Sequence, residues 1–438
     1  MLYRKIQAAL KDYFSLESNK VLIIDGARQV GKSFIIRHVG QEMFENYIEV
    51  NLLEDANGAR FFESVKTPQD FYLRLSAIAG GRLGERSKTL VFLDEIQAYP
   101  HLLTMLKFLK AENRYTYIAS GSLLGVALSQ SVSIPMGSIQ VRHMYPLDFE
   151  EFLIANGFGK EIIDYMRDQF LQEKTLDEGM HAKVLDLFKK YLLVGGMPDA
   201  VNAFLEQTDI VAIRDIQAEI HRYYGADASQ YDTANRLKIR RVYDMIPSNL
   251  ENKRKRVFVN QIEGKAGKRF SDYAEEFDYL IQAGIALEVK AVSQPKFPLL
   301  ESSRKNLLKL YLNDVGILTG LLYGRNIGVV LDEESGINLG SVYESVVAQE
   351  LNAHGHELYY YDNKKNGEVD FLVESDKLLS VVPIEVKSGK DYKVHSALNA
   401  FVDNAEYNIK KSLVLSNNRD IYTENGITYM PIYYVMFL

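Results

Sequence analysis

The sequence predicts an α/β protein that begins with a doubly wound parallel sheet built around a phosphate-binding loop. Residues 20–39, KVLIIDGARQVGKSFIIRHV, show an apolar strand, a glycine-containing loop and a helix in direct succession. A second apolar strand, TLVFLD, ends in two acids, Asp94 and Glu95. Apolar runs and helical segments alternate up to about residue 150, and this alternation is typical of a parallel sheet with crossover helices.

The composition is that of an ordinary globular protein and excludes several classes of site. The 438 residues are 47% hydrophobic and 25% charged, which favours roughly two to four domains. There is no cysteine, so disulfides, zinc–thiolate sites and cysteine nucleophiles are excluded. The N-terminal segment is amphipathic and charged, and no apolar run approaches the roughly 20 residues that span a bilayer. We therefore expect a cytoplasmic protein without a membrane partner.

The loop fits the pattern G-x-x-x-x-G-K-[ST] from Gly26 to Ser33. Glycines let backbone N–H groups surround a phosphate, and the following helix points its positive end at the same phosphate. Lys32 would reach the β- and γ-phosphates, and Ser33 would ligate Mg²⁺. The predicted nucleotide contacts are Gly26, Arg28, Gln29, Val30, Gly31, Lys32, Ser33 and Phe34.

The strand that ends at Asp94 predicts the second half of a nucleotide site. Asp94 would hold Mg²⁺ through water, and Glu95 would polarise the water that attacks the γ-phosphate. An acid pair at a strand end is common by itself. About sixty residues after a phosphate-binding loop, the catalytic interpretation is the stronger one.

A third strand, YTYIASGS, is expected to lie between the two strands just described. Its polar end would then point at the γ-phosphate, so Ser120 is the predicted sensor of that phosphate, with Ser122 as the second choice. The segments NYIEVNL and IQVRHMYPL complete a five-stranded parallel sheet, in which ligands bind at the carboxyl ends of the strands. Together these features predict an ATPase with ATP and Mg²⁺ as cofactors.

Five segments occur in an order that resembles a known family: GARQVGKS, FLDEIQAYP, IASGS, MYPLDFEEFL and YLLVGGMPDAV. The family comprises AAA+-type ATPases of bacteria and archaea whose C-terminal domain, of unknown function, is similar to restriction endonucleases of the PD-(D/E)XK type. The resemblance covers essentially the whole chain and implies four regions. They are an ATPase core of the AAA+/ASCE type at 1–150, a helical lid at 151–230, a winged-helix-like segment at 231–330 and a nuclease-like α/β domain at 331–438.

The chain departs from this family where an arginine finger is expected. Relatives should carry a basic residue just before the PLDFEEF segment, but Met136-Gly137-Ser138 offers none, and Arg142 is the nearest cation. Arg28, inside the loop itself, could supply positive charge in cis. The sequence leaves an oligomeric assembly open.

The middle of the chain favours a helical lid followed by a winged helix. Helical periodicity reaches Val194 and resumes after Pro198, and the Gly195-Gly196 break predicts a close packing point or a hinge. The helix expected before the wing carries four acids and no Lys or Arg. It is therefore unsuited to reading DNA in the usual winged-helix manner.

A basic segment precedes that acidic helix. Residues 236–270 hold eleven Lys or Arg against three Asp or Glu, and a basic island on an acidic protein is a candidate phosphate-contacting surface. Arg254, Lys255 and Arg256 are the candidate contacts with DNA. A solvated charged face or a surface for protein packing explains the same pattern equally well.

The C-terminal region predicts the order α-β-β-β-α-β, which is the core of the PD-(D/E)XK fold. On this layout Asp370 and Glu385 face each other on adjacent strands, and Glu344 on the first helix leans over the same spot. These three carboxylates would gather Mg²⁺ or Mn²⁺, and Lys387 would stabilise the developing anion beside them. A Glu-x-Lys triplet on a strand is very common, so this prediction depends on its combination with the fold order.

The sequence thus predicts an ATP-hydrolysing motor or switch fused to a metal-dependent nuclease-like domain that acts on nucleic acid. An alternative from another class is a signalling ATPase whose winged-helix and nuclease-like domains only bind protein or DNA. A nuclease toxin or defence effector gated by ATP is a third interpretation that the sequence does not separate from the first.

Overall fold

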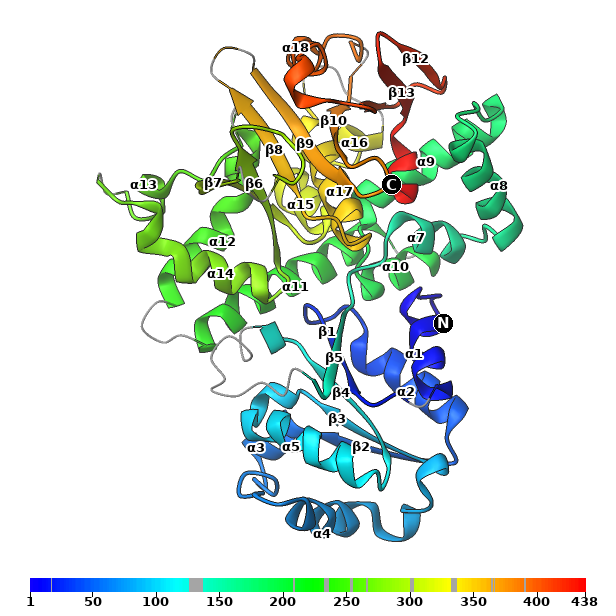
Figure 1. The fold of residues 1–438 in the computed structure, drawn as a ribbon, viewed down its shortest axis with the longest axis vertical. Coiled ribbons are helices and arrows are strands. Elements are labelled where there is room, and N and C mark those ends of the chain that lie inside the picture. Colours follow the sequence, from blue (N-terminus) through cyan, green and yellow to red (C-terminus); the bar gives the residue numbers. More distant parts are fainter. Residues whose placement is uncertain are drawn as a thin grey trace. The chain divides into compact units, whose positions relative to one another are not determined.

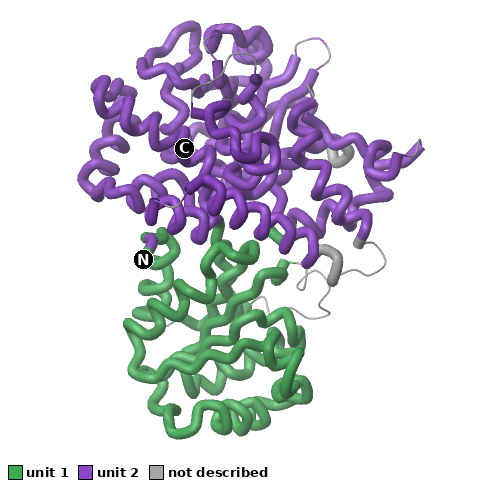
Figure 2. Tube along the Cα trace, turned by 180° about the vertical axis from the view of Figure 1, so that it is seen from behind, with its two compact units in different colours: residues 1, 3–145, 282–284 green, residues 2, 146–281, 285–438 purple. Residues whose placement is uncertain are grey.

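Figure 1 shows the fold in a computed structural model, which describes residues 1–16, 18–125, 137–207, 209–231, 236–252, 255–264, 267–299, 303–331, 337–363, 365, 367–389 and 391–438. No helix among these residues is long and apolar enough to cross a membrane. The chain divides into two compact units, coloured separately in Figure 2. Unit 1 comprises residues 1, 3–145 and 282–284, and unit 2 comprises residues 2, 146–281 and 285–438.

Unit 1 contains a five-stranded sheet with the order β2-β3-β4-β1-β5, in which every pairing is parallel. Its strands are β1 (Val21–Asp25), β2 (Asn46–Asn51), β3 (Thr89–Asp94), β4 (Thr116–Gly121) and β5 (Ile139–His143). All six residues of β3 are buried, as expected of a central parallel strand covered on both faces. The predicted position of β4 between β1 and β3 is confirmed.

The helices α1 (Ile6–Ser15), α2 (Lys32–Met43), α3 (Leu52–Asn57), α4 (Pro68–Ala79) and α5 (Pro100–Glu112) accompany this sheet in the part of the chain that the structure describes. The start of α4 is fixed by a capping box between Thr67 and Asp70, with Pro68 in its first turn. Apolar side chains of α4 and α5, among them Phe71 and Leu106, pack with those of β1 to β4 in one core cluster. The packed helices hold the sheet so that the polar strand ends stay on one edge.

Unit 2 contains an eight-stranded mixed sheet with the order β12-β13-β11-β10-β9-β8-β6-β7. Its strands are β6 (Ala286–Val292), β7 (Ser303–Leu312), β8 (Tyr359–Asn363), β9 (Gly367–Ser375), β10 (Ser380–Lys387), β11 (Leu413–Ser416), β12 (Tyr422–Glu424) and β13 (Ile427–Pro431). The predicted order α-β-β-β-α-β is present as α17-β8-β9-β10-α18-β11.

The hairpin predicted as a wing does not stand free. Strands β6 and β7 pair antiparallel with each other, and β6 also pairs in parallel with β8. The predicted boundary near residue 331 therefore cuts through one continuous sheet. Sequence patterns located both strands but could not reveal this pairing, because β6 and β8 are far apart along the chain.

The helices of the rest of the chain are α7 (Phe149–Ala155), α8 (Lys160–Leu171), α9 (Glu178–Val194), α10 (Pro198–Leu205), α11 (Ile210–Tyr231), α12 (Arg236–Glu251), α13 (Val259–Ile262), α14 (Ala274–Gln282), α15 (Val315–Tyr323), α16 (Gly328–Leu331), α17 (Gly340–Ala353) and α18 (Ser396–Val402). Helix α17 is buried at every position from Ser341 to Leu351. A helix buried on all sides lies inside a large core, so the polar residues that it carries are buried as well.

The Gly195-Gly196 break between α9 and α10 is a close packing point. The Gly196 N–H donates to Asp314 Oδ2 at 2.6 Å, and the Gly196 carbonyl accepts from the Leu147 N–H at 2.7 Å. A side chain on Gly196 would collide with the Leu147 backbone. Gly195 adopts a φ of +72°, which other residues rarely do. The packing interpretation of this break is thus confirmed.

Candidate functional site

The loop between β1 and α2 has the geometry that its glycines allow. Gly26 and Gly31 have φ values of +140° and +95°, which L side chains rarely adopt. A Cβ on Gly26 would also meet the Met144 carbonyl. Helix α2 begins directly at Lys32, so its free N–H groups point at the space inside the loop.

Lys32 is buried against the loop that carries it. Its Nζ donates to the carbonyls of Gly26 at 2.9 Å and Ala27 at 2.7 Å. Burial lowers the pKa of Lys32, although the charges of Glu95, Asp25 and Asp94 oppose that effect. The ammonium group thus lies among neutral carbonyls, with acids close by but not bonded to it.

Asp94, at the end of β3, links the loop to the neighbouring strand. Its Oδ2 accepts from Ser33 Oγ at 2.7 Å, and its Oδ1 accepts from Ser120 Oγ. Burial raises the pKa of Asp94, while both serine hydroxyls act to lower it. A serine hydroxyl and a carboxylate in contact at the start of a helix are a suitable donor set for Mg²⁺, so these residues fit the predicted metal.

Glu95 lies directly after Asp94 in a left-handed backbone conformation, with a φ of +53°. Its Oε2 accepts from Gln97 Nε2 and from Ser122 Oγ, the latter at 2.8 Å. Burial alone would raise the pKa of Glu95, but the bond from Gln97, the Lys32 charge and the bond from Ser122 bring it below its ordinary value. Glu95 is therefore ionised near neutral pH, as a general base requires.

The predicted nucleotide-site residues gather at this edge of the sheet, and Ser120 and Ser122 each contact one of the two acids there. Ser120 is fully buried, and its hydroxyl supports Asp94; its role as phosphate sensor stays a prediction. Ser122, the second choice, touches Glu95 and accepts from Arg28 Nε at 3.3 Å. Sequence reasoning missed Gln97, although its position two residues after Glu95 was a usable signal.

The outer residues of the loop differ in exposure. Val30 is fully buried, whereas Phe34 is 56% exposed and stacks against His38. Gln29 adopts a φ of +66°. No structural observation tests whether Gln29 or Phe34 touches a nucleotide, so both stay predictions.

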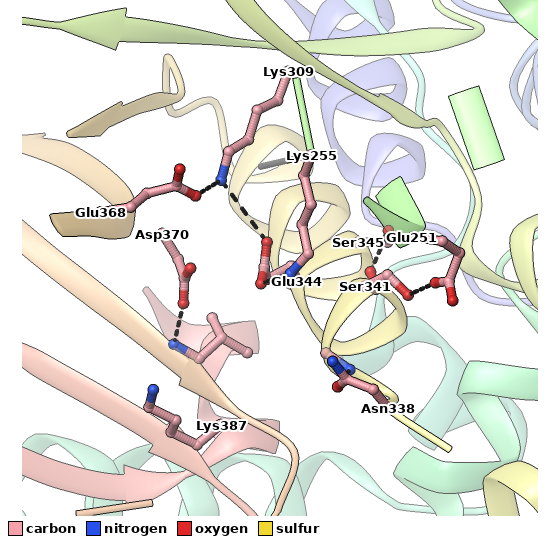
Figure 3. Close-up of polar contacts among 12 residues, drawn as sticks. Glu251, Lys255, Lys309, Asn338, Ser341, Glu344, Ser345, Glu368, Asp370 and Lys387 are labelled. Carbon is pink, nitrogen blue, oxygen red and sulfur yellow. Dashed lines mark hydrogen bonds and ion pairs between the residues drawn. The ribbon is translucent and has the colours of Figure 1, made fainter. Parts of the chain in front are cut away.

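A second group of charged residues lies in unit 2 around Glu344 of α17 (Figure 3). Glu344 Oε1 forms an ion pair with Lys255, and its Oε2 accepts from Tyr311 OH at 3.0 Å. Lys309 Nζ lies 4.0 Å from Glu344 Oε2 and 2.5 Å from Glu368 Oε1. Both lysine ammonium groups point at the same carboxylate in Figure 3.

These ion pairs decide which groups are charged. Burial would raise the pKa of Glu344, but Lys255 and Lys309 hold it below its ordinary value. Burial would likewise lower the pKa of Lys309, but Glu344, Glu368 and Asp370 raise it instead. Glu344 and Lys309 are therefore both ionised inside the core.

The predicted hairpin residues lie next to this group. The Val386 N–H donates to Asp370 Oδ2 at 2.8 Å, and Lys387 Nζ lies 2.9 Å from Glu385 Oε1. Strands β9 and β10 pair Phe371 with Ile384, so the same register continued by one residue places Asp370 opposite Glu385. Burial, with the charges of Glu344 and Glu385, raises the pKa of Asp370 well above its usual range.

The cluster does not have the form of a metal centre. Among the described residues, no three His, Cys, Asp or Glu side chains form a group that could hold a metal ion. The prediction that Glu344, Asp370 and Glu385 together form such a site is therefore not met in this structure. The physical reason is that Lys255 and Lys309 supply the positive charge that Glu344 would otherwise require from a cation.

The basic segment at 236–270 is also used internally. Lys255 pairs with Glu344 and Arg256 with Asp362, and both side chains are largely buried. The prediction that these two cations face a DNA backbone is therefore corrected. Arg254 lies outside the described residues.

Comparisons with known proteins identify one domain of the chain. Residues 18–153 match the family model described as an AAA domain. Residues 185–326 and 339–435 match two domains of unknown function, DUF8612 and DUF4143 respectively. No curated protein matches this sequence closely enough to be a relative. The AAA match agrees with the parallel sheet and its loop, so residues 18–153 are similar to an AAA domain and have a P-loop α/β fold.

Several solved structures are similar to the chain at low identity. A Walker-type ATPase of Pyrococcus abyssi is 14% identical with a TM-score of 0.43, covering 74% of this chain and 96% of that one. Cdc6p from Pyrobaculum aerophilum is 13% identical with a TM-score of 0.26, covering 75% and 94%. The Holliday junction branch migration motor RuvB of Thermotoga maritima is 16% identical with a TM-score of 0.26, covering 64% and 86%. Likenesses at this level carry no argument about substrate or partner.

Proposed function

We propose that unit 1 binds ATP with Mg²⁺ and hydrolyses it. The observation that carries this proposal is the continuous set of contacts at the carboxyl edge of the sheet. Ser33 bonds to Asp94, and the residue after Asp94, Glu95, is half-buried, ionised and bonded to Ser122. These contacts support the proposal, because groups suited to bind phosphate, to hold a metal ion and to act as a general base lie together where a parallel sheet binds its ligand.

Each residue has a distinct task in this scheme. Lys32 exchanges the carbonyls of Gly26 and Ala27 for phosphate oxygens, a change favoured because charge-assisted hydrogen bonds are the stronger ones. Ser33 and Asp94 would hold Mg²⁺, which neutralises charge on the transferred phosphate. Glu95 accepts the proton of the attacking water, and Arg28 supplies positive charge from the loop in cis.

The binding half of this proposal is tested by Lys32→Ala. Loss of the ammonium group removes charge-assisted contacts with the phosphates, so ATP affinity should fall on the order of 100-fold or more. Equilibrium titration with a fluorescent ATP analogue measures this fall. Lys88→Ala is the matched control, because Lys88 is an exposed lysine paired with Glu45 at 2.9 Å. Equal affinities of Lys32→Ala and the native protein would contradict the proposal.

For unit 2 the geometry favours a binding or switching role over cleavage. The observation behind this choice is that Glu344 is already neutralised by Lys255 and Lys309. We therefore infer an ATP-driven switch whose C-terminal domain does not cut nucleic acid in the conformation described. Action on DNA stays a prediction.

This choice is tested by incubating the protein with single-stranded, duplex and supercoiled DNA in Mg²⁺ or Mn²⁺, with and without ATP. The expected result is intact DNA under each condition. Cleavage by the native protein that an Asp370→Ala/Lys387→Ala variant lacks would restore the nuclease prediction. ATPase acceleration by DNA would show that DNA is nevertheless a ligand.

A further inference from the structure

The carboxylate of Glu95 is held at one of its two oxygens. Its Oε2 accepts hydrogen bonds from Gln97 Nε2, from Ser122 Oγ at 2.8 Å and from the Ser122 N–H at 3.4 Å. Its Oε1 accepts none from any residue that the structure describes. The backbone φ of Glu95 is +53°, a conformation that residues with a side chain rarely adopt. Fixed donors thus orient this side chain, and Oε1 is the oxygen left to accept a proton.

The side-chain amide of Gln97 serves this carboxylate. Its Nε2 donates to Glu95 Oε2 and, at 3.4 Å, to Ser122 Oγ. Its Oε1 is buried and bonds to no described residue. The reverse orientation would place the amide oxygen against a carboxylate oxygen, and two acceptors repel each other. The charge-assisted bond to Glu95 therefore offsets the cost of an unbonded amide oxygen.

The end of strand β4 restricts the space around this amide. A Cβ added at Gly121 would lie 2.7 Å from Gln97 Oε1, which is closer than non-bonded carbon and oxygen atoms pack. Gly121 belongs to β4, so alanine there would meet the Gln97 amide without straining the backbone. The absence of a side chain at Gly121 therefore leaves room for the amide beside Glu95.

We propose that Gln97 is a positioning residue for the general base, which fixes Oε2 of Glu95 so that Oε1 faces the attacking water. The inference rests on the ATP hydrolysis proposed for unit 1 and names the residue that orients its base. In that step Oε1 takes a proton from water, the water oxygen bonds to the γ-phosphorus, and ADP leaves with the electron pair of the broken P–O bond. Gln97 acts through Glu95, because its amide bonds only to Glu95 and to Ser122 among the described residues.

The variant Gln97→Leu removes the amide and keeps a side chain of similar size. Its kcat for ATP should fall on the order of 10- to 100-fold, because a hydrogen bond to a charged group is lost. KM and ATP affinity should stay near the native values, since Lys32 and Ser33 keep their contacts. Steady-state phosphate release measures both constants. Gln41→Leu, which replaces an exposed glutamine of α2, is the matched control and should change neither.

A double-variant cycle separates positioning from a structural role. If Gln97 acts through the Glu95 carboxylate, adding Gln97→Leu to Glu95→Gln should cause no further loss of turnover. A structural role would lower turnover by the same factor in both backgrounds. The proposal is overturned by native kcat in Gln97→Leu or by equal losses in the two backgrounds. Native turnover by Glu95→Gln is a different failure, because it would contradict the proposed hydrolysis and the positioning role with it.

The variant Gly121→Ala covers the case in which Gln97→Leu does not fold. Its new Cβ should displace the Gln97 amide without altering either bonded partner. We expect kcat to fall several-fold with KM unchanged, and the fall to disappear in the Glu95→Gln background. Gly81→Ala is the control, because a Cβ there would meet nothing within 4 Å. Native kcat in Gly121→Ala, or the same loss in both backgrounds, would overturn the role of Gln97.

Discussion

The P-loop of unit 1 and the charged cluster of unit 2 both bury lysines beside acids, yet they use them differently. Lys32 bonds to two backbone carbonyls, while the nearby acids bond to serine hydroxyls and an amide. In the cluster, Lys309 and Lys255 pair directly with carboxylates. In the first arrangement the lysine and carboxylate charges are not paired with each other, so they are available for a ligand. In the second arrangement they neutralise each other within the protein. The residue types alone do not distinguish a ligand site from an internal ion-pair network.

The largest stability effect should come from breaking the cluster. Lys309→Met leaves the buried Glu344 and the half-buried Glu368 without their fixed counter-ion, so the unfolding free energy should fall by about 3–5 kcal/mol. Lys32→Met should cost less, because the partners that it leaves are neutral carbonyls. Denaturant unfolding of both variants measures the contrast. Equal losses would remove the distinction between the two sites.

A matched control tests whether the loss of stability depends on burial of the lysine. Lys290→Met removes a lysine that pairs with Glu288 at 3.4 Å and is partly exposed. Its cost should stay within about 1 kcal/mol, as for surface ion pairs in general. The double variant Lys309→Met/Glu368→Gln should recover part of the loss, since the carboxylate that Lys309 bonds most closely is then removed.

A pH effect of up to about 3 kcal/mol should follow from Asp314, a buried acid held by backbone N–H groups instead of a lysine. Burial raises its pKa to about 6, although N–H donors such as Gly196 and Ile317 oppose the shift. A raised carboxyl pKa favours the folded state while the group is protonated. This contribution is present below the unfolded pKa and is lost as pH rises through about 6.

The unfolding free energy of Asp314→Asn, relative to that of the native protein, should therefore increase as the pH rises from about 4 to 7. The difference is measured by denaturant unfolding at several pH values. Glu344 has the opposite sign, because its pKa is lowered; its contribution is present above the unfolded pKa and is lost as pH falls through the folded pKa. A pH-independent difference for Asp314→Asn would contradict this assignment.

The smallest effect is expected at Ser122. Its hydroxyl donates to Glu95 at 2.8 Å and helps to lower the pKa of that carboxyl. Ser122→Ala should therefore move the acid limb of the kcat/KM profile to higher pH, by about one unit or less. Ser248→Ala, on helix α12, is the comparison, because the Ser248 hydroxyl donates to the Met245 carbonyl instead. An unshifted profile for Ser122→Ala would show that the Ser122 hydroxyl does not lower the pKa of Glu95.

The sequence predicted unit 1 in more detail than unit 2 because its chemistry is local. The loop, the acids after β3 and the place of β4 in the sheet all follow from short motifs and strand order. In unit 2 the sequence also placed Glu344 on a helix and Asp370 and Glu385 on neighbouring strands, as the structure has them. Lys255 lies 89 residues from its partner Glu344, and Lys309 lies 59 residues from Glu368. No local pattern reveals pairs so distant, although a lysine within the apolar strand LLKLYLN was a signal that it needed a buried partner.

The most direct test of the account is ATP turnover by Glu95→Gln. Gln keeps the shape of the side chain but cannot accept the proton of the attacking water. ATP binding should therefore remain near the native value, while phosphate release should fall by about 10²- to 10⁴-fold. Native turnover by Glu95→Gln would contradict the assignment of Glu95 as the base, and with it the central claim that this edge of the sheet hydrolyses ATP.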